Sequence, residues 1–132
     1  MNIAATPAAE ALRVYLVEDS PLVLERLEAM VDAVAARTVG CASSAREAID
    51  GILAERPDLV VLDLRLEQGS GFEVLRALHD RAPAIDVLML TNFATEPYRR
   101  LAERLGARGF FDKSTEFDGV REALKARARR LH

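Results

Sequence analysis

The apolar positions of the chain fall into short runs that alternate with helically spaced segments. The run Leu59 to Leu62 is wholly apolar, follows Pro57 closely and is followed directly by Asp63. Such an unbroken run is typical of a strand covered on both faces, as in a parallel sheet. Taken alone, Asp63 is as compatible with simple strand termination as with chemistry, because open α/β sheets bind ligands at the carboxyl ends of their strands.

Four further β-rich runs have a similar character, and segments with helical spacing separate them. Besides 59–62, the predicted strands are 13–17, 37–42, 86–90 and 109–111. The predicted helices are 21–34, 43–56, 72–81, 95–105 and a last helix that residues 114–117 lead into and that ends near residue 130. Strands that alternate with helices over short connections predict an α/β fold, a doubly wound five-stranded parallel sheet with helices on both faces. Residues 1–11 are rich in Ala and contain Pro7, so we expect a flexible leader before a single domain over 12–132.

Composition indicates the class of protein but does not indicate a binding partner. The 132 residues are 50% hydrophobic and 30% charged, as in one globular domain, and the net charge of -3 indicates neither a nucleic-acid nor a membrane partner. No signal peptide and no apolar stretch near ~20 residues is present, so a cytoplasmic location is expected. The single Cys41 excludes an internal disulfide, and we expect it to be buried.

Polar residues follow four of the predicted strands at the point where each strand ends. Glu18 and Asp19 follow strand 13–17, and Asp63 follows strand 59–62. Thr91 follows strand 86–90, and Lys113 comes after strand 109–111. In a parallel sheet these ends meet at one edge, and a cluster of carboxylates there needs a compensating cation. Oxygen ligands on a rigid frame suit Mg²⁺. We therefore predict a magnesium and phosphoryl site, with Asp63 as nucleophile and with Lys113 and Thr91 stabilising the phosphoryl oxygens.

Together these five positions resemble the receiver domain of two-component response regulators, and the resemblance covers Leu12 to Leu131. It implies a flavodoxin-like fold with strand order 2-1-3-4-5. It also implies that Asp63 is the phosphoacceptor for a sensor histidine kinase or a histidine phosphotransfer protein. Mg²⁺ would be held by Glu18, Asp19, Asp63 and the backbone carbonyl of Arg65.

The same resemblance assigns residues for a conformational switch and two positions that influence the lifetime of the aspartyl phosphate. Thr91 would couple to Phe110, three residues before Lys113, and reshape the face formed by helix 95–105, the last strand and the last helix. That face would control a downstream protein partner or a phosphorylation-linked homodimer. Arg65 and Phe93 would flank the pocket mouth and hinder water that attacks the aspartyl phosphate. Glu67, where many receivers have Pro, is expected to loosen or redirect the loop after Asp63.

Three functions remain open at this stage. The first is a stand-alone signalling module that is no enzyme beyond its own phosphotransfer and autodephosphorylation. The second is the receiver part of a longer DNA-binding response regulator. The third is a magnesium-dependent aspartyl-phosphate phosphatase, which would want an acid two residues after the nucleophile, where Arg65 stands. The basic residues from Arg121 to Arg130 predict a solvated helix end or, as the alternative, a partner-docking or linker role.

Overall fold

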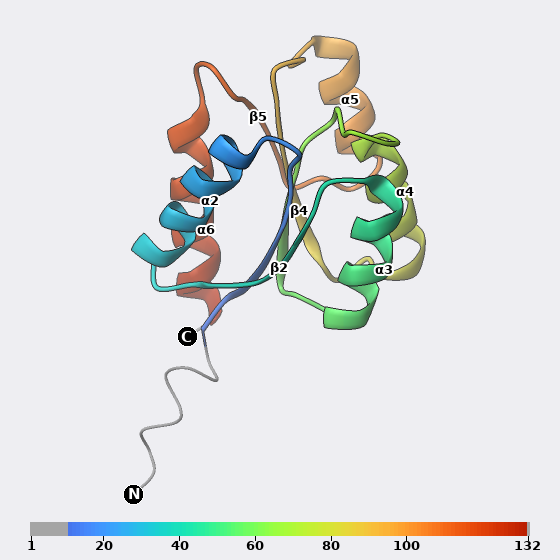
Figure 1. Cartoon of the computed structure of the whole chain (residues 1–132). Helices are drawn as coiled ribbons and strands as arrows, with labels where there is room; N and C mark the ends of the chain where they lie inside the picture. The colour runs from blue at the N-terminus through green and yellow to red at the C-terminus, as the bar shows by residue number, and fades with distance from the viewer. Residues whose placement is uncertain (1–10, 132) are drawn as a thin grey trace, which may run out of the picture.

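Ten alternating elements make up the computed structural model, which describes residues 11–131 (Figure 1). The predicted leader over 1–11 therefore lies almost wholly outside the described residues. The elements are β1 (Arg13–Val17), α2 (Pro21–Ala33), β2 (Arg37–Ala42), α3 (Ala45–Glu55), β3 (Leu59–Leu62), α4 (Gly71–Arg81), β4 (Asp86–Thr91), α5 (Glu96–Arg104), β5 (Gly109–Asp112) and α6 (Phe117–Leu131). Each predicted element is present, with ends that differ by at most a few residues.

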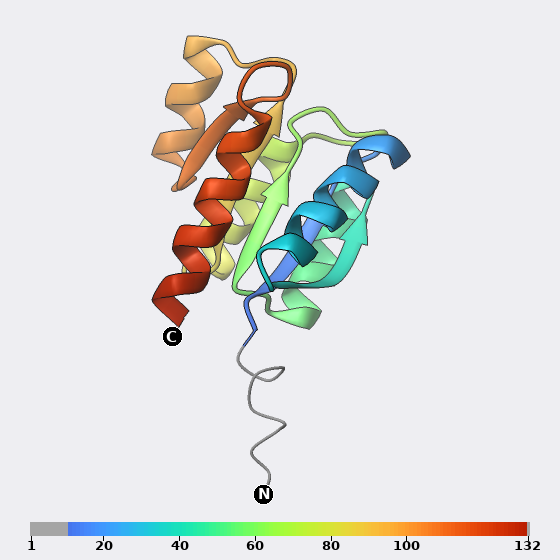
Figure 2. The ribbon, with the colours of Figure 1, turned by 90° about the vertical axis from the view of Figure 1, so that its left-hand side faces the viewer.

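The five strands form one parallel sheet in the order β2-β1-β3-β4-β5, which confirms the predicted fold. Helices α2 and α6 cover one face, and α3, α4 and α5 cover the other (Figures 1 and 2). Because all strands run the same way, their carboxyl ends meet at one edge of the sheet. No helix within residues 11–131 is long and apolar enough to cross a bilayer.

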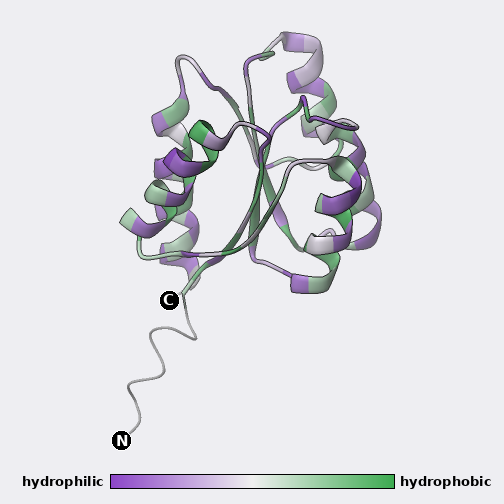
Figure 3. Ribbon diagram, in the orientation of Figure 1, coloured by the Kyte–Doolittle hydropathy of each residue, from purple (hydrophilic) through white to green (hydrophobic). Residues whose placement is uncertain are grey.

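Side chains of the central strand β3 pack into two separate hydrophobic cores, one on each face of the sheet. Leu59 and Val61 pack into the core beneath α2 and α6, whereas Val60 and Leu62 pack into the core beneath α3, α4 and α5. All four are at most 1% exposed. The apolar sides of the helices face the sheet in Figure 3. Two-sided burial is the physical reason for the unbroken apolar run in the sequence.

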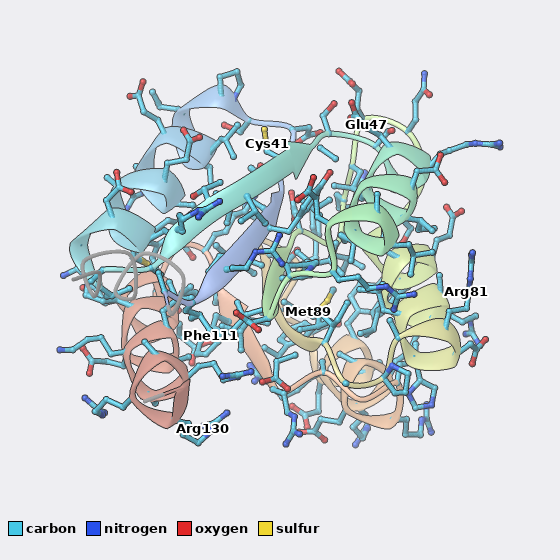
Figure 4. All side chains as sticks on the ribbon, turned by 90° about the horizontal axis from the view of Figure 1, so that it is seen from below. Cys41, Glu47, Arg81, Met89, Phe111 and Arg130 are labelled. Atoms are coloured by element: carbon cyan, nitrogen blue, oxygen red, sulfur yellow. The ribbon has the colours of Figure 1, made fainter. Side chains whose placement is uncertain are left out.

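Edge strand β2 departs from expectation at Cys41, which is exposed rather than buried (Figure 4). The alternation along an edge strand turns this side chain away from the core. Gly40, one residue earlier, seats the ring of Tyr15, because a Cβ at Gly40 would lie 2.5 Å from the ring atom Cε2. A bulge shifts the register between β1 and β2 at this point.

Hydrogen bonds hold the loop after Asp63, in which Glu67 is expected to loosen or redirect the chain. Ser43 Oγ donates to Glu67 Oε1 at 3.2 Å, and the amide of Gly71 donates to the carbonyl of Leu64 at 2.8 Å. Helix α4 then begins with a reciprocal capping box between Ser70 and Glu73. The loop that carries the strand-end carboxylate is thus held by hydrogen bonds rather than by proline.

Candidate phosphoacceptor site

Lys113 joins two carboxylates at the carboxyl edge of the sheet. Its Nζ lies 2.9 Å from Glu18 Oε1 and 3.0 Å from Asp63 Oδ2. Glu18 and Asp63 are 3% and 5% exposed. The strands place these groups together because Glu18 follows β1, Asp63 follows β3 and Lys113 follows β5. The backbone amides of Ser20 and Arg65 donate to the remaining oxygens of the two acids, at 3.0 Å and 3.4 Å.

Asp19 completes a cluster of three acids that fits a divalent cation. One carboxylate oxygen from each of Glu18, Asp19 and Asp63 lies within 4.8 Å of the others. Three carboxylates against the single ammonium of Lys113 leave a net negative charge at a site where Glu18 and Asp63 are buried and Asp19 is exposed. Oxygen donors of this kind are those that Mg²⁺ prefers, so the residues present fit the predicted metal.

The pKa values of these groups reflect crowding and burial. Burial raises the pKa of the Asp63 carboxyl, and Lys113 only partly opposes that effect. Burial likewise raises the pKa of Glu18 against the hydrogen bond from Lys113. Burial lowers the pKa of Lys113, but its hydrogen bonds and its attraction to Glu18 and Asp63 outweigh this, so its pKa is raised overall. The ionised acids therefore lack enough positive charge around them, which a cation would supply.

Thr91 ends β4 at the same edge of the sheet and is fully buried, with 0% exposure. The amide of Phe93 donates to Thr91 Oγ1 at 3.1 Å. Because that bond uses a lone pair of the hydroxyl oxygen, the hydroxyl proton stays free of this bond and can be donated to a phosphoryl oxygen. The amide of Lys113 donates to the Thr91 carbonyl at 2.9 Å, which ties the ends of β4 and β5 together.

Phe110 lies inward, 6% exposed, and Arg99 covers its ring. The guanidinium carbon of Arg99 is 4.9 Å from the ring centroid, and its Nη1 donates to the Phe110 carbonyl at 3.0 Å. Arg99 also pairs with Glu116 at 3.8 Å. Arg99 was not predicted from the sequence. It lies eleven positions before Phe110 and reaches that ring only because the tertiary fold brings α5 beside β5.

Arg65 and Phe93, predicted to flank the pocket, contact each other. The guanidinium carbon of Arg65 lies 4.5 Å from the centroid of the Phe93 ring. Phe93 is 41% exposed, so the pair forms an outer cover rather than part of the core. Such a cation–π contact is worth roughly 0.5–1 kcal/mol at an exposed site. The structure brings Glu18, Asp19, Asp63 and Lys113 together, and it places Arg65 against Phe93. The backbone carbonyl of Arg65 as a metal ligand stays a prediction, as do the roles of Thr91 and Phe110 in a switch.

A parallel sheet of this strand order, with three acids, a lysine and a threonine at its carboxyl edge, defines the receiver class of signalling domains. The family model for the response regulator receiver domain matches residues 14–125. The chain belongs to this family, which confirms the resemblance drawn from its sequence.

Known proteins of this family share the fold at modest identity. The DNA-binding transcriptional activator DevR/DosR of Mycobacterium tuberculosis is 35% identical over 118 residues, covering 86% of this chain and 53% of that protein. The two-component response regulator of the LuxR family from Aurantimonas sp. SI85-9A1 superposes with a TM-score of 0.83 at 28% identity, over 90% of this chain and 86% of that one.

A third comparison concerns the metal. The receiver domain of the sensor histidine kinase PA1611 from Pseudomonas aeruginosa PAO1, described with a magnesium ion in its active-site cleft, has a TM-score of 0.76 at 20% identity. The match covers 90% of this chain and 98% of that one, and at this identity it shows the fold alone. This chain spans 58%, 56% and 53% of the length of three curated relatives that it matches.

Proposed function

We propose that this chain is a phosphoacceptor signalling module that receives a phosphoryl group on Asp63 from a histidine kinase or a histidine phosphotransfer protein in the cytoplasm. The observation that supports it best is the position of Lys113, within 3.0 Å of both Glu18 and Asp63 at the carboxyl edge of the sheet. Packing alone does not account for two nearly buried acids around one ammonium.

Each residue of the site has a defined task in the proposed transfer. An Asp63 oxygen forms a bond to phosphorus while the bond from phosphorus to the donor's imidazole nitrogen breaks, and the imidazole leaves with the electron pair. Lys113 and the Thr91 hydroxyl hold the phosphoryl oxygens as negative charge gathers there. Mg²⁺ bound by Glu18, Asp19, Asp63 and the Arg65 carbonyl would supply further neutralisation of the same charge.

The switch proposed for this chain begins at Thr91 and ends at Phe110. When Thr91 moves toward a phosphoryl group, the space beside Phe110 changes and the ring can reorient. In this chain the ring moves only if Arg99 releases or follows it, because Arg99 holds both the ring and the Phe110 carbonyl. The face of α5, β5 and α6 would then present a changed surface to a downstream protein or to a second copy.

Two alternative functions were considered for this domain, a part of a longer DNA-binding regulator and a phosphatase. Relatives such as DevR/DosR are DNA-binding activators, so this chain as the receiver part of a longer DNA-binding regulator is the second candidate. A reading frame that continues into a DNA-binding domain would favour it. A phosphatase is disfavoured because Arg65, where the general acid would stand, is stacked on Phe93 and offers no proton.

The proposal predicts covalent phosphorylation by a small donor. Incubation with acetyl phosphate and Mg²⁺ should add one phosphoryl group to the intact protein, measured by mass spectrometry. Removal of the metal with a chelator should suppress the adduct. An unmodified mass after prolonged incubation with both reagents would contradict the proposal.

A second prediction concerns the Arg65 and Phe93 cover. If the stacked pair keeps water from the aspartyl phosphate, Phe93→Ala and Arg65→Ala should each speed dephosphorylation several-fold, measured as loss of the adduct over time. Because the two side chains act as one contact, the double variant should be little faster than either single one. Arg104→Ala, an exposed arginine on α5, serves as the control. Unchanged rates in both single variants would rule out this role.

A further inference from the structure

Three arginines converge on one buried carboxylate at the edge of the sheet opposite the phosphoacceptor site. Asp86, the first residue of β4, is 9% exposed. Arg127 Nε lies 2.7 Å from Asp86 Oδ2, Arg108 Nε lies 3.2 Å from Oδ1, and Arg130 Nη2 lies 3.7 Å from Oδ2. Arg130 is labelled in Figure 4, on the last turns of α6. The cluster therefore carries two positive charges more than its single acid neutralises.

A cavity of about 430 Å³ opens among these side chains. Its apolar lining comes from the sheet residues Leu59 and Leu88 and from Ala123 and Ala126 of α6. The two alanines leave room where larger side chains would fill the space between α6 and the sheet. A cavity of this size lies within the range of small-molecule sites, which combine apolar walls with a few convergent polar groups.

A purely structural role explains only part of the cluster. Arg127, with 20% of its side chain exposed, is enough to pair with Asp86. Arg127 and Arg130 also suit the C-terminal end of α6, where the helix dipole favours cations. Neither reason accounts for Arg108, which comes from the connection between α5 and β5 and is 72% exposed as a side chain. The neighbouring Asp58 does not line the cavity, and its Oδ2 accepts from the amide of Arg13 at 2.9 Å.

We propose that this cavity binds a small phosphomonoester that carries an apolar or aromatic group. Guanidinium groups match phosphate oxygens in pairs of parallel hydrogen bonds, and an excess of two positive charges matches a phosphate dianion. Each arginine approaches Asp86 with one nitrogen, so Asp86 would hold the arginines in place while their other nitrogens bind the phosphate. Ala123 and Ala126, which are partly exposed, would contact the apolar group of the ligand, and the buried Leu59 and Leu88 lie behind them.

This cavity is distinct from the phosphoacceptor site, since Asp86 begins β4 and Thr91 ends it. At about 3.3 Å per residue the two lie some 17 Å apart along the strand. The inference does not depend on the proposed phosphotransfer. Its test can therefore use the Asp63→Asn protein with a chelator present, in which neither Mg²⁺ nor Asp63 contributes to binding of a phosphate.

The test compares three probes by isothermal titration calorimetry on that protein: phenyl phosphate, inorganic phosphate and benzoate. Phenyl phosphate should bind saturably at one site and more tightly than the other two, because only it offers both the dianion and the ring. Arg108→Gln and Arg130→Gln, both at exposed side chains, should each weaken it by about tenfold or more. Ala126→Leu should abolish binding by filling the cavity.

Arg104→Gln, outside the cavity, is the matched control and should bind phenyl phosphate as the parent does. Melting curves of every variant check that the protein remains folded. The inference is overturned if phenyl phosphate shows no saturable binding in the millimolar range, or if Arg104→Gln weakens it as much as the cavity variants do. Equal binding of benzoate would overturn the phosphate class, and equal binding of inorganic phosphate would overturn the role of the apolar wall.

Discussion

Replacement of Asp63 by Asn should abolish the phosphoryl adduct formed from acetyl phosphate and Mg²⁺. The amide keeps the shape of the carboxyl group but has no anionic oxygen to attack phosphorus. The protein should remain folded, because Lys113 keeps its contact with Glu18 at 2.9 Å. Burial raises the pKa of Asp63, so the ionised carboxylate is costly to hold, and its loss should leave the free energy of unfolding unchanged or higher.

A control variant and two measurements test whether this effect is specific to Asp63. Asp80→Asn, an exposed position on α4, should be phosphorylated like the parent protein. Intact mass gives the extent of modification, and urea denaturation gives the stability of each variant. An adduct that persists in Asp63→Asn would move the acceptor to another residue and overturn the assignment of Asp63.

Replacement of Gly71 by Ala should destabilise the domain and disturb the site together. Gly71 begins α4, and a Cβ there would overlap the backbone carbonyl oxygen of Asp63 and lie 2.9 Å from Leu64 Cα. The backbone atoms of the buried residues Asp63 and Leu64 cannot rotate away as a side chain can. We expect a loss of about 1–3 kcal/mol in the free energy of unfolding, as for other overpacked interiors, measured by urea denaturation.

Gly119→Ala is the matched control, on helix α6. A Cβ there meets the Phe111 ring at 2.8 Å, but that ring belongs to a partly exposed side chain that can shift. Alanine also favours the helix by up to about 1 kcal/mol over glycine. The change in stability should therefore be small or favourable. If Gly71→Ala were as mild as Gly119→Ala, the loop after Asp63 would be softer than its contacts indicate.

The strand ends could be predicted well from the sequence. Glu18, Asp63 and Lys113 are far apart along the chain, yet Glu18 and Asp63 directly follow an apolar run and Lys113 comes two residues after one. The alternation of strands and helices implies a parallel sheet, and a parallel sheet brings such ends to one edge. The candidate site therefore followed from local pattern and topology alone.

Side-chain conformation at the surface could not be predicted in the same way. The stack of Arg65 on Phe93 and the contact of Arg99 with Phe110 depend on rotamers of long side chains, which no periodicity encodes. Cys41 was expected in the core because its residue type is usually buried. It is exposed because β2 lies at the sheet edge, and sheet order came only from the resemblance.

That exposure has a practical consequence for spectroscopy. Cys41 is the sole thiol of the chain, so a maleimide dye or a nitroxide would attach at one defined position without removal of other cysteines. It lies on edge strand β2, and β5 with Phe110 is the opposite edge. With strands about 4.8 Å apart, roughly 19 Å separate the two edges. A label at Cys41 thus provides a fixed reference point from which movement of the α5, β5 and α6 face can be measured.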